Sequence, residues 1–126
     1  MKKFVTLLLC MLPVSLFAQV NDGIRQAMDN YDYETVVTLI EPDCQDSLLL
    51  ITKAQALKAM NRYPEAIGVL NSLILKDSTN TKVLIDLAEC YKLTGNSRRA
   101  ANCYQKAMNL QPENKFFRLQ FIRSLL

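Results

Sequence analysis

The sequence contains no histidine and no tryptophan, and only three of its 126 residues are glycine. Without histidine the chain lacks the side chain that most often acts as a general base near neutral pH. It also has no glycine-rich phosphate loop, no nucleophile beside a plausible activating base, and no cysteine pair with zinc-ligand spacing. We therefore expect no enzymatic activity within these residues, no cofactor and no bound metal.

The chain also lacks a large net charge and a long hydrophobic run. Its formal charge of +3 is too small to favour nucleic acid as a partner. Residues 1–18 have a basic start, an apolar run of about 14 residues and a small last residue, whereas a membrane-spanning helix needs ~20 apolar residues. We expect a secretory signal peptide, cleaved after Ala18, and a protein exported to a periplasm or cell envelope. The alternatives are an uncleaved membrane anchor, which would be the one membrane contact, and an ordinary core helix.

Removal of residues 1–18 would leave three cysteines, Cys44, Cys90 and Cys103. Because three is odd, at least one thiol stays free or pairs between chains. A bridge between Cys90 and Cys103 is conceivable, but we favour two small buried side chains. Asp43 and Asp46 flank Cys44, and such carboxylates raise the pKa of a thiol and make it less reactive.

The most informative stretch is 81–114, which predicts two helices joined by a tight turn. Apolar residues recur at steps of three and four on both sides of Gly95, a residue suited to the positive φ found just past a helix end. Asn96 or Ser97 would cap the second helix, and Pro112 would end it. The predicted inner stripes are Leu84, Leu87, Ala88 and Tyr91, then Ala100, Tyr104, Ala107 and Met108. Small Ala88 and Ala100 would let the helices approach closely as an antiparallel hairpin.

Similar patterns predict further helices along the rest of the chain. Asn21 or Asp22 would cap the first of them, and Ser47 the third. Pro64 suits the first turn of the fourth helix, where its missing N–H has no partner to lose. The predicted ranges are 21–30, 31–40, 47–60, 63–75 and 115–126.

A fixed period of 34 residues relates 47–80 to 81–114: Ala54 and Ala88 are separated by it, and so are Ala66 and Ala100. Paired helices at such a period indicate stacked repeats. The pattern resembles the tetratricopeptide repeat family, most fully over 81–114, where Leu84 replaces the family's leading aromatic residue. The resemblance implies an all-α fold of antiparallel hairpins stacked as a right-handed superhelix.

Other parts of the chain depart more from that pattern. The repeat 47–80 has Ser78 in place of the usual proline. Residues 19–46 resemble a shortened, degenerate hairpin, since DYETV at 32–36 aligns with RYPEA at 62–66 at a spacing of 30 rather than 34. Residues 115–126 resemble the first helix of a further repeat or a terminal helix.

In the tetratricopeptide family the first helices of the hairpins line a concave groove that binds peptides or partner proteins. The resemblance therefore implies a binding surface of ten side chains, which we call the groove residues. They are Leu48, Ile51, Thr52, Gln55 and Lys58 on one helix and Lys82, Ile85, Asp86, Glu89 and Lys92 on the next. Arg123 would follow on the last helix. The simpler interpretation is a solvated face on which Glu89 forms weak ion pairs with Lys82 or Lys92.

Some members of the family clamp a terminal carboxylate with Lys and Asn side chains in the groove. Here Ile51 and Gln55 occupy the places of the first Lys and Asn, and Asp86 that of a second Asn. An acidic side chain repels a carboxylate, so this use of the groove is not supported.

Charge and hydrophobicity differ between the two ends of the chain. Residues 19–46 carry a net charge of −6 and residues 81–126 one of +5, a bias that could favour head-to-tail self-association. Residues 115–126 are apolar around much of the helix, which predicts self-association through them or a chain that continues as a longer array; we favour the second.

The function we infer is a scaffold that binds a protein or peptide in the groove, through Ile51 and Ile85 with charged neighbours setting selectivity. Alternatives are a structural N-terminal repeat region of a larger envelope protein, or the docking arm of an enzyme whose catalytic domain lies beyond residue 126.

Overall fold

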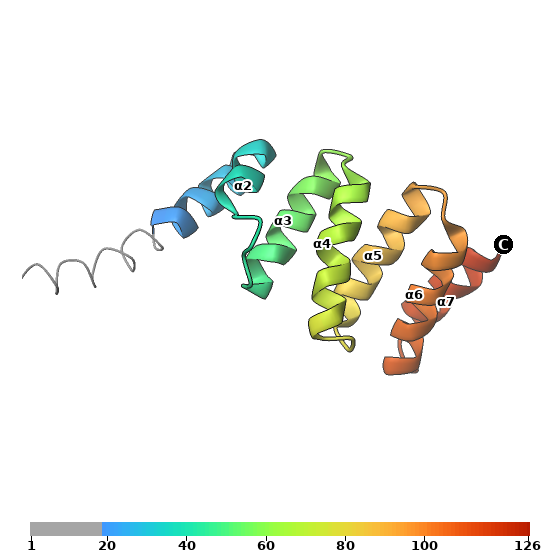
Figure 1. Cartoon of the computed structure of the whole chain (residues 1–126). Coiled ribbons are helices and arrows are strands. Elements are labelled where there is room, and N and C mark those ends of the chain that lie inside the picture. Colours follow the sequence, from blue (N-terminus) through green and yellow to red (C-terminus); the bar gives the residue numbers. More distant parts are fainter. Residues whose placement is uncertain (1–18) are drawn as a thin grey trace, which may run out of the picture.

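A computed structural model describes residues 19–126, and this part of the chain consists of helices joined by short turns (Figure 1). The expected signal segment 1–18 lies outside the described residues. Within 19–126, no helix combines the length and apolarity needed to cross a bilayer. The first helix covers 19–29, and six follow: α2 (Tyr33–Leu39), α3 (Ser47–Ala59), α4 (Tyr63–Lys76), α5 (Thr81–Leu93), α6 (Ser97–Leu110) and α7 (Lys115–Leu125).

Five of the helices begin at an Asp or Asn side chain that accepts hydrogen bonds from the first-turn N–H groups. Asn96 caps α6, as expected, but Asp46 rather than Ser47 caps α3, at 2.9 Å from the Leu48 nitrogen. Position 46 still has extended backbone, which points its carboxylate at these donors. The other caps are Asp32, Asn80 and Asn114. The prediction that Asn21 or Asp22 caps the first helix is wrong, because both residues lie within that helix.

The turn inside each hairpin is the same structure built three times. Tyr31, Asn61 and Gly95 adopt positive φ values of 58°, 61° and 81°. In each turn the following N–H donates to a carbonyl five residues earlier at 2.8 Å, a bond that satisfies the end of the preceding helix. The spacings of these turns, 30 and then 34 residues, are those of the sequence alignment. The division of the chain into repeats with the boundaries given above stays a prediction.

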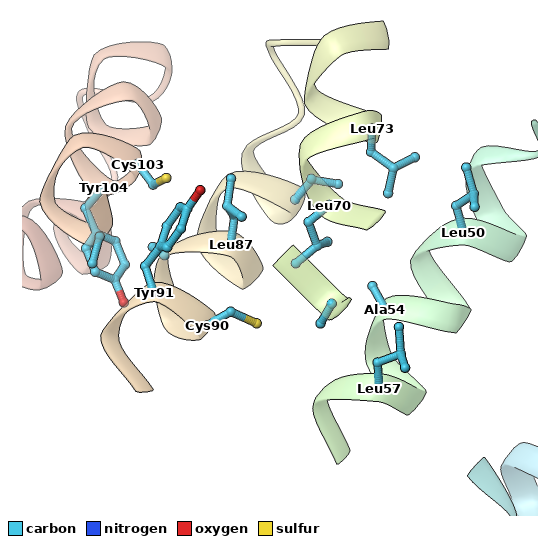
Figure 2. Packing of buried hydrophobic residues seen from close by; sticks show 14 residues of the cluster. Leu50, Ala54, Leu57, Leu70, Leu73, Leu87, Cys90, Tyr91, Cys103 and Tyr104 are labelled. Atoms are coloured by element: carbon cyan, nitrogen blue, oxygen red, sulfur yellow. The ribbon is translucent and has the colours of Figure 1, made fainter. Parts of the chain in front are cut away.

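Consecutive helices pack side by side in a row from the first to the last (Figure 1). The largest core cluster joins α3, α4, α5 and α6, with leucines and small residues between the layers (Figure 2). Ala88 is fully buried and Ala100 is 1% exposed, which permits the close approach of α5 and α6 that their small side chains predict. The leucines, Tyr91 and Tyr104 of the predicted stripes are also buried.

Two smaller clusters lie at the ends of the row. The N-terminal one packs the helix 19–29 and α2 against α3 through Ile24, Val36 and Ala56. The C-terminal one holds α7 through Phe117, which packs with Leu84 and Ala107. Five apolar side chains of residues 115–126 nevertheless remain on the surface: Phe116, Leu119, Ile122, Leu125 and Leu126.

The three cysteines of the described residues are free thiols. Cys90 and Cys103 are buried, and burial raises the pKa of both. They serve as small core side chains, the interpretation that we favoured from the sequence.

Candidate functional site

Three of the groove residues meet in one ion cluster between repeats. Lys58, near the end of α3, donates a hydrogen bond to the Glu89 carboxylate of α5. Its Nζ also lies 3.9 Å from Asp86 Oδ1. We call these three residues the ion cluster. The cluster links the first helices of successive hairpins, so residues that are 31 positions apart in sequence share one surface.

The charges of the ion cluster act on one another because the site is half-buried. Burial opposes the charged form of Lys58, but the hydrogen bond and charge of Glu89, with the charge of Asp86, raise the pKa of Lys58 overall. The pKa of Asp86 is also raised, chiefly by burial, since Lys58 offsets this only in part. Lys58 is therefore held as a cation and is occupied by its own chain.

This arrangement corrects the expected ion pairs along α5. Glu89 pairs with Lys58 across helices rather than with Lys82 or Lys92 along its own helix. Within residues 19–126, Lys82 and Lys92 form no ion pair, and both are exposed. They remain available as charges on the groove surface.

Ile51 and Ile85, the expected apolar contact points, are half-buried and pack against the core. Ile85 also packs on the C-terminal cluster around Leu84 and Phe117. Both side chains therefore help to hold the repeats together, and only part of each faces solvent.

The open part of the groove surface lies at the N-terminal end. The helix 19–29 and α3 enclose a hollow of about 400 Å³, which we call the N-terminal hollow. Three groove residues line it: Leu48, which is 76% exposed, Thr52 and Gln55. Ile24, Met28 and Leu49 supply apolar walls, and Asn21, Arg25 and Asp46 supply polar ones.

Sequence reasoning missed the contribution of the helix 19–29 to this hollow. Ile24 and Met28 lie one turn apart on the face that was assigned to the core. Ile24 does pack in the core, but Met28 is only half-buried. The signal was present in their spacing, but periodicity cannot separate a core-facing stripe from one that also borders a hollow.

A second hollow, of about 490 Å³, lies on the opposite face of α3. It is bordered by α4 and by the loop after α2, and we call it the connector hollow. Leu50, Lys53 and Leu57 of α3 line it, together with Pro42 and Cys44 of the loop. Lys76 closes one edge by donating to the Gln45 carbonyl at 2.8 Å.

Nothing in the described residues assembles a reaction centre. No three Cys, Asp or Glu side chains of residues 19–126 come close enough together to hold a metal ion. What the geometry offers is a surface of exposed apolar and charged side chains, with a hollow at one end, built on rigid stacked helices.

The comparisons with known proteins agree with this geometry. A family model described as "Tetratricopeptide repeat" matches residues 57–120, just over half of the chain. The chain belongs to the tetratricopeptide repeat family. It is all-helical, with its helices in stacked hairpins, as the sequence predicts.

A curated relative is the DnaJ homolog subfamily C member 7 homolog of Dictyostelium discoideum, 35% identical over 86 residues. The match covers 67% of this chain, but only 16% of that relative's length.

Two solved structures share the fold at low sequence identity. One is the Yersinia enterocolitica type III secretion chaperone SycD with a peptide of the translocator YopD (TM-score 0.69, 20% identity, 88% of this chain and 90% of that one). The other is the first TPR of Spaghetti (RPAP3) bound to the HSP90 peptide SRMEEVD (TM-score 0.67, 16% identity, 88% of each chain).

Proposed function

We propose that this protein is an exported protein-interaction module that binds a segment of a partner protein along the groove surface. The N-terminal hollow is the observation that carries the proposal, because exposed apolar side chains surround enough space for a large side chain of a partner. Two structures of the same fold hold peptides, which supports this class of function.

The mechanism follows from the division of the groove surface. An apolar side chain of the partner would enter the N-terminal hollow against Leu48 and Met28 and release water from both surfaces. The ion cluster is already paired and offers few free charges, whereas Lys82 and Lys92 would select acidic neighbours in the partner. Ile51 and Ile85 would contribute only their exposed edges.

The test is to select peptides from a displayed random library with the immobilised protein and to measure their affinity for variants. Leu48→Asp places a charge in the N-terminal hollow, and we expect it to weaken binding at least tenfold. Leu75→Asp is the matched control, because Leu75 is 89% exposed on α4 and lines none of the three hollows described. Equal affinities for the two variants, or no selected peptides, would contradict the proposal.

Export is the second part of the proposal, and it is supported by the composition of residues 1–18. A fusion of the chain to a reporter enzyme that is active only outside the cytoplasm should be active. N-terminal sequencing of the recovered protein should begin at Gln19. A reporter that stays inactive would remove the envelope location and leave the binding proposal standing.

The surface of α7 favours a second candidate role, head-to-tail self-association. Leu119 and Ile122 are about half exposed on a helix whose charged side chains are all basic, while residues 19–46 carry a net charge of −6. A second copy could therefore dock its acidic N-terminal end on α7. Sedimentation at rising protein concentration should show salt-sensitive association that Ile122→Asp abolishes; a monomer at all concentrations would exclude this role.

A further inference from the structure

A third, smaller hollow of about 110 Å³ lies where α5 ends, α6 begins and α7 passes. That volume is several times the ~15 Å³ that one water molecule needs, and it suits a small polar group. Its lining includes the hydroxyl-bearing Ser97, Tyr104 and Ser124, the amide of Gln120 and the cationic Lys92 and Arg123. We call it the α7 hollow.

Tyr104 has a buried hydroxyl with no partner. Its side chain is 2% exposed, and its oxygen forms no hydrogen bond with any residue of 19–126. By contrast, the hydroxyl of Tyr91, which points in the opposite direction in Figure 2, accepts a hydrogen bond from Asn71 at 3.3 Å. No fully enclosed polar side-chain atom of the described residues lacks a partner, so the Tyr104 oxygen must be open to solvent. The α7 hollow, which Tyr104 lines, provides that opening.

The hollow is bordered by positive charge that the protein does not neutralise. Lys92 and Arg123 form no ion pair within the described residues. The nearest acid along α5, Glu89, is one turn from Lys92 but is occupied by Lys58. The helix α6, 14 residues long, begins at Ser97 and directs the positive end of its dipole toward the same region.

We propose that the α7 hollow is an oxyanion-binding pocket, in which the Tyr104 hydroxyl donates a hydrogen bond to a carboxylate or phosphate group between Lys92 and Arg123. Burial, and next the charge of Glu89, raises the pKa of Tyr104, which keeps the hydroxyl a donor at neutral pH. This pocket differs from a terminal-carboxylate clamp in the groove, since it uses a side chain of the second helix, α6. As the site for an acidic or phosphorylated side chain of the bound partner, it rests on the proposed function.

The experiment uses small ions, so it does not depend on a partner being known. Sodium acetate and sodium phosphate are titrated separately into the full chain at constant ionic strength, and the backbone amides of Ser97, Tyr104 and Ser124 are followed by NMR. We expect saturating shifts with at least one ion. Saturation with acetate alone would indicate an acidic side chain as the natural source, and saturation with phosphate a phosphorylated one.

Two variants and one control make the result specific. Tyr104→Phe removes only the unpartnered oxygen, so the fold should be kept and the affinity for the ion should fall about tenfold. Arg123→Gln should weaken binding similarly. Arg118→Gln is the control, because Arg118 on the same helix donates to the Pro112 carbonyl and lies outside the hollow.

Shifts that rise linearly without saturation, or that persist unchanged in Tyr104→Phe and Arg123→Gln, would overturn the pocket. Because the ions bind without any peptide, this outcome is distinct from failure of the Leu48→Asp test, which would reject peptide binding at the N-terminal hollow and leave the ion result untouched.

Discussion

The hairpin of residues 19–46 and the hairpin of 81–114 share one turn but differ in their second helix. Helix α2 has 7 residues, whereas α6 has 14. The turn before each helix is nevertheless the same, with a positive φ at Tyr31 in one and at Gly95 in the other. The backbone geometry of the turn is therefore preserved even where half of the following helix is absent.

The shorter helix changes the surface of its neighbour. Half of α2 is replaced by the loop 40–46, which packs less tightly than a helix against α3 and α4, and the connector hollow results. At the other end, α6 runs the full length of α5, and Ala88 and Ala100 pack with almost no exposed surface. One hairpin is thus closed and intolerant of added volume, and the other leaves space beside it.

The largest expected effect comes from adding volume to the closed hairpin. Ala100→Leu would force apart α5 and α6, and we expect a loss of about 3 kcal/mol in the free energy of unfolding. Urea denaturation followed by circular dichroism measures it. Asn102→Leu, on the exposed side of α6, is the control and should change stability by less than about 0.5 kcal/mol. Equal effects would mean that the hairpin is less closely packed than the buried alanines indicate.

The shared turn predicts two substitutions of opposite sign. Gly95→Ala should destabilise by about 1 kcal/mol, because a Cβ is strained at φ 81°. Tyr31→Gly should stabilise by a similar amount, since it removes the same strain at φ 58° from a side chain that is 76% exposed. Thermal unfolding of the two variants compares them directly. If both changed stability in the same direction, the two turns would not be equivalent.

The space beside the first hairpin predicts a smaller gain. Gly68 lies on α4 at the connector hollow, and a Cβ placed there would meet no atom within 4 Å. Gly68→Ala should therefore stabilise the protein by about 0.5–1 kcal/mol through helix propensity alone. Denaturation midpoints in urea measure this. A loss of stability would show that the hollow is filled in solution.

The smallest effect concerns the pH dependence of the ion cluster. Because the folded pKa of Lys58 is raised above its unfolded value, its contribution is fully present below about pH 10.4 and is lost as pH rises through the folded pKa. The free energy of unfolding of the wild type should therefore fall more steeply above that pH than that of Lys58→Met. Lys106→Met, an exposed change on α6, should keep the wild-type slope.

Much of the fold could be predicted from the sequence because the signals are local. The stripes that contain Leu87 and Tyr104, the turn at Gly95 and the period of 34 residues depend on helix geometry and on backbone preferences of single residues. Errors at this level were small: the cap of α3 is one residue earlier than expected, and the first helix begins before its expected caps. Neighbouring Asp and Ser can both cap, and only the backbone at position 46 decides between them.

The candidate site was less predictable because it depends on how one repeat is rotated against the next. The sequence placed Lys58 and Glu89 on a common face, but their pairing required α3 and α5 to come side by side. The same stacking decided that Ile85 is half-buried, that the helix 19–29 adds Met28 to the N-terminal hollow, and that the Tyr104 hydroxyl faces an unfilled space. The sequence by itself determined the repeats and their inner faces, since these follow from periodicity within single helices. The hollows, and the charges left unpaired beside them, were decided only by tertiary structure, because they arise between helices that are distant in sequence.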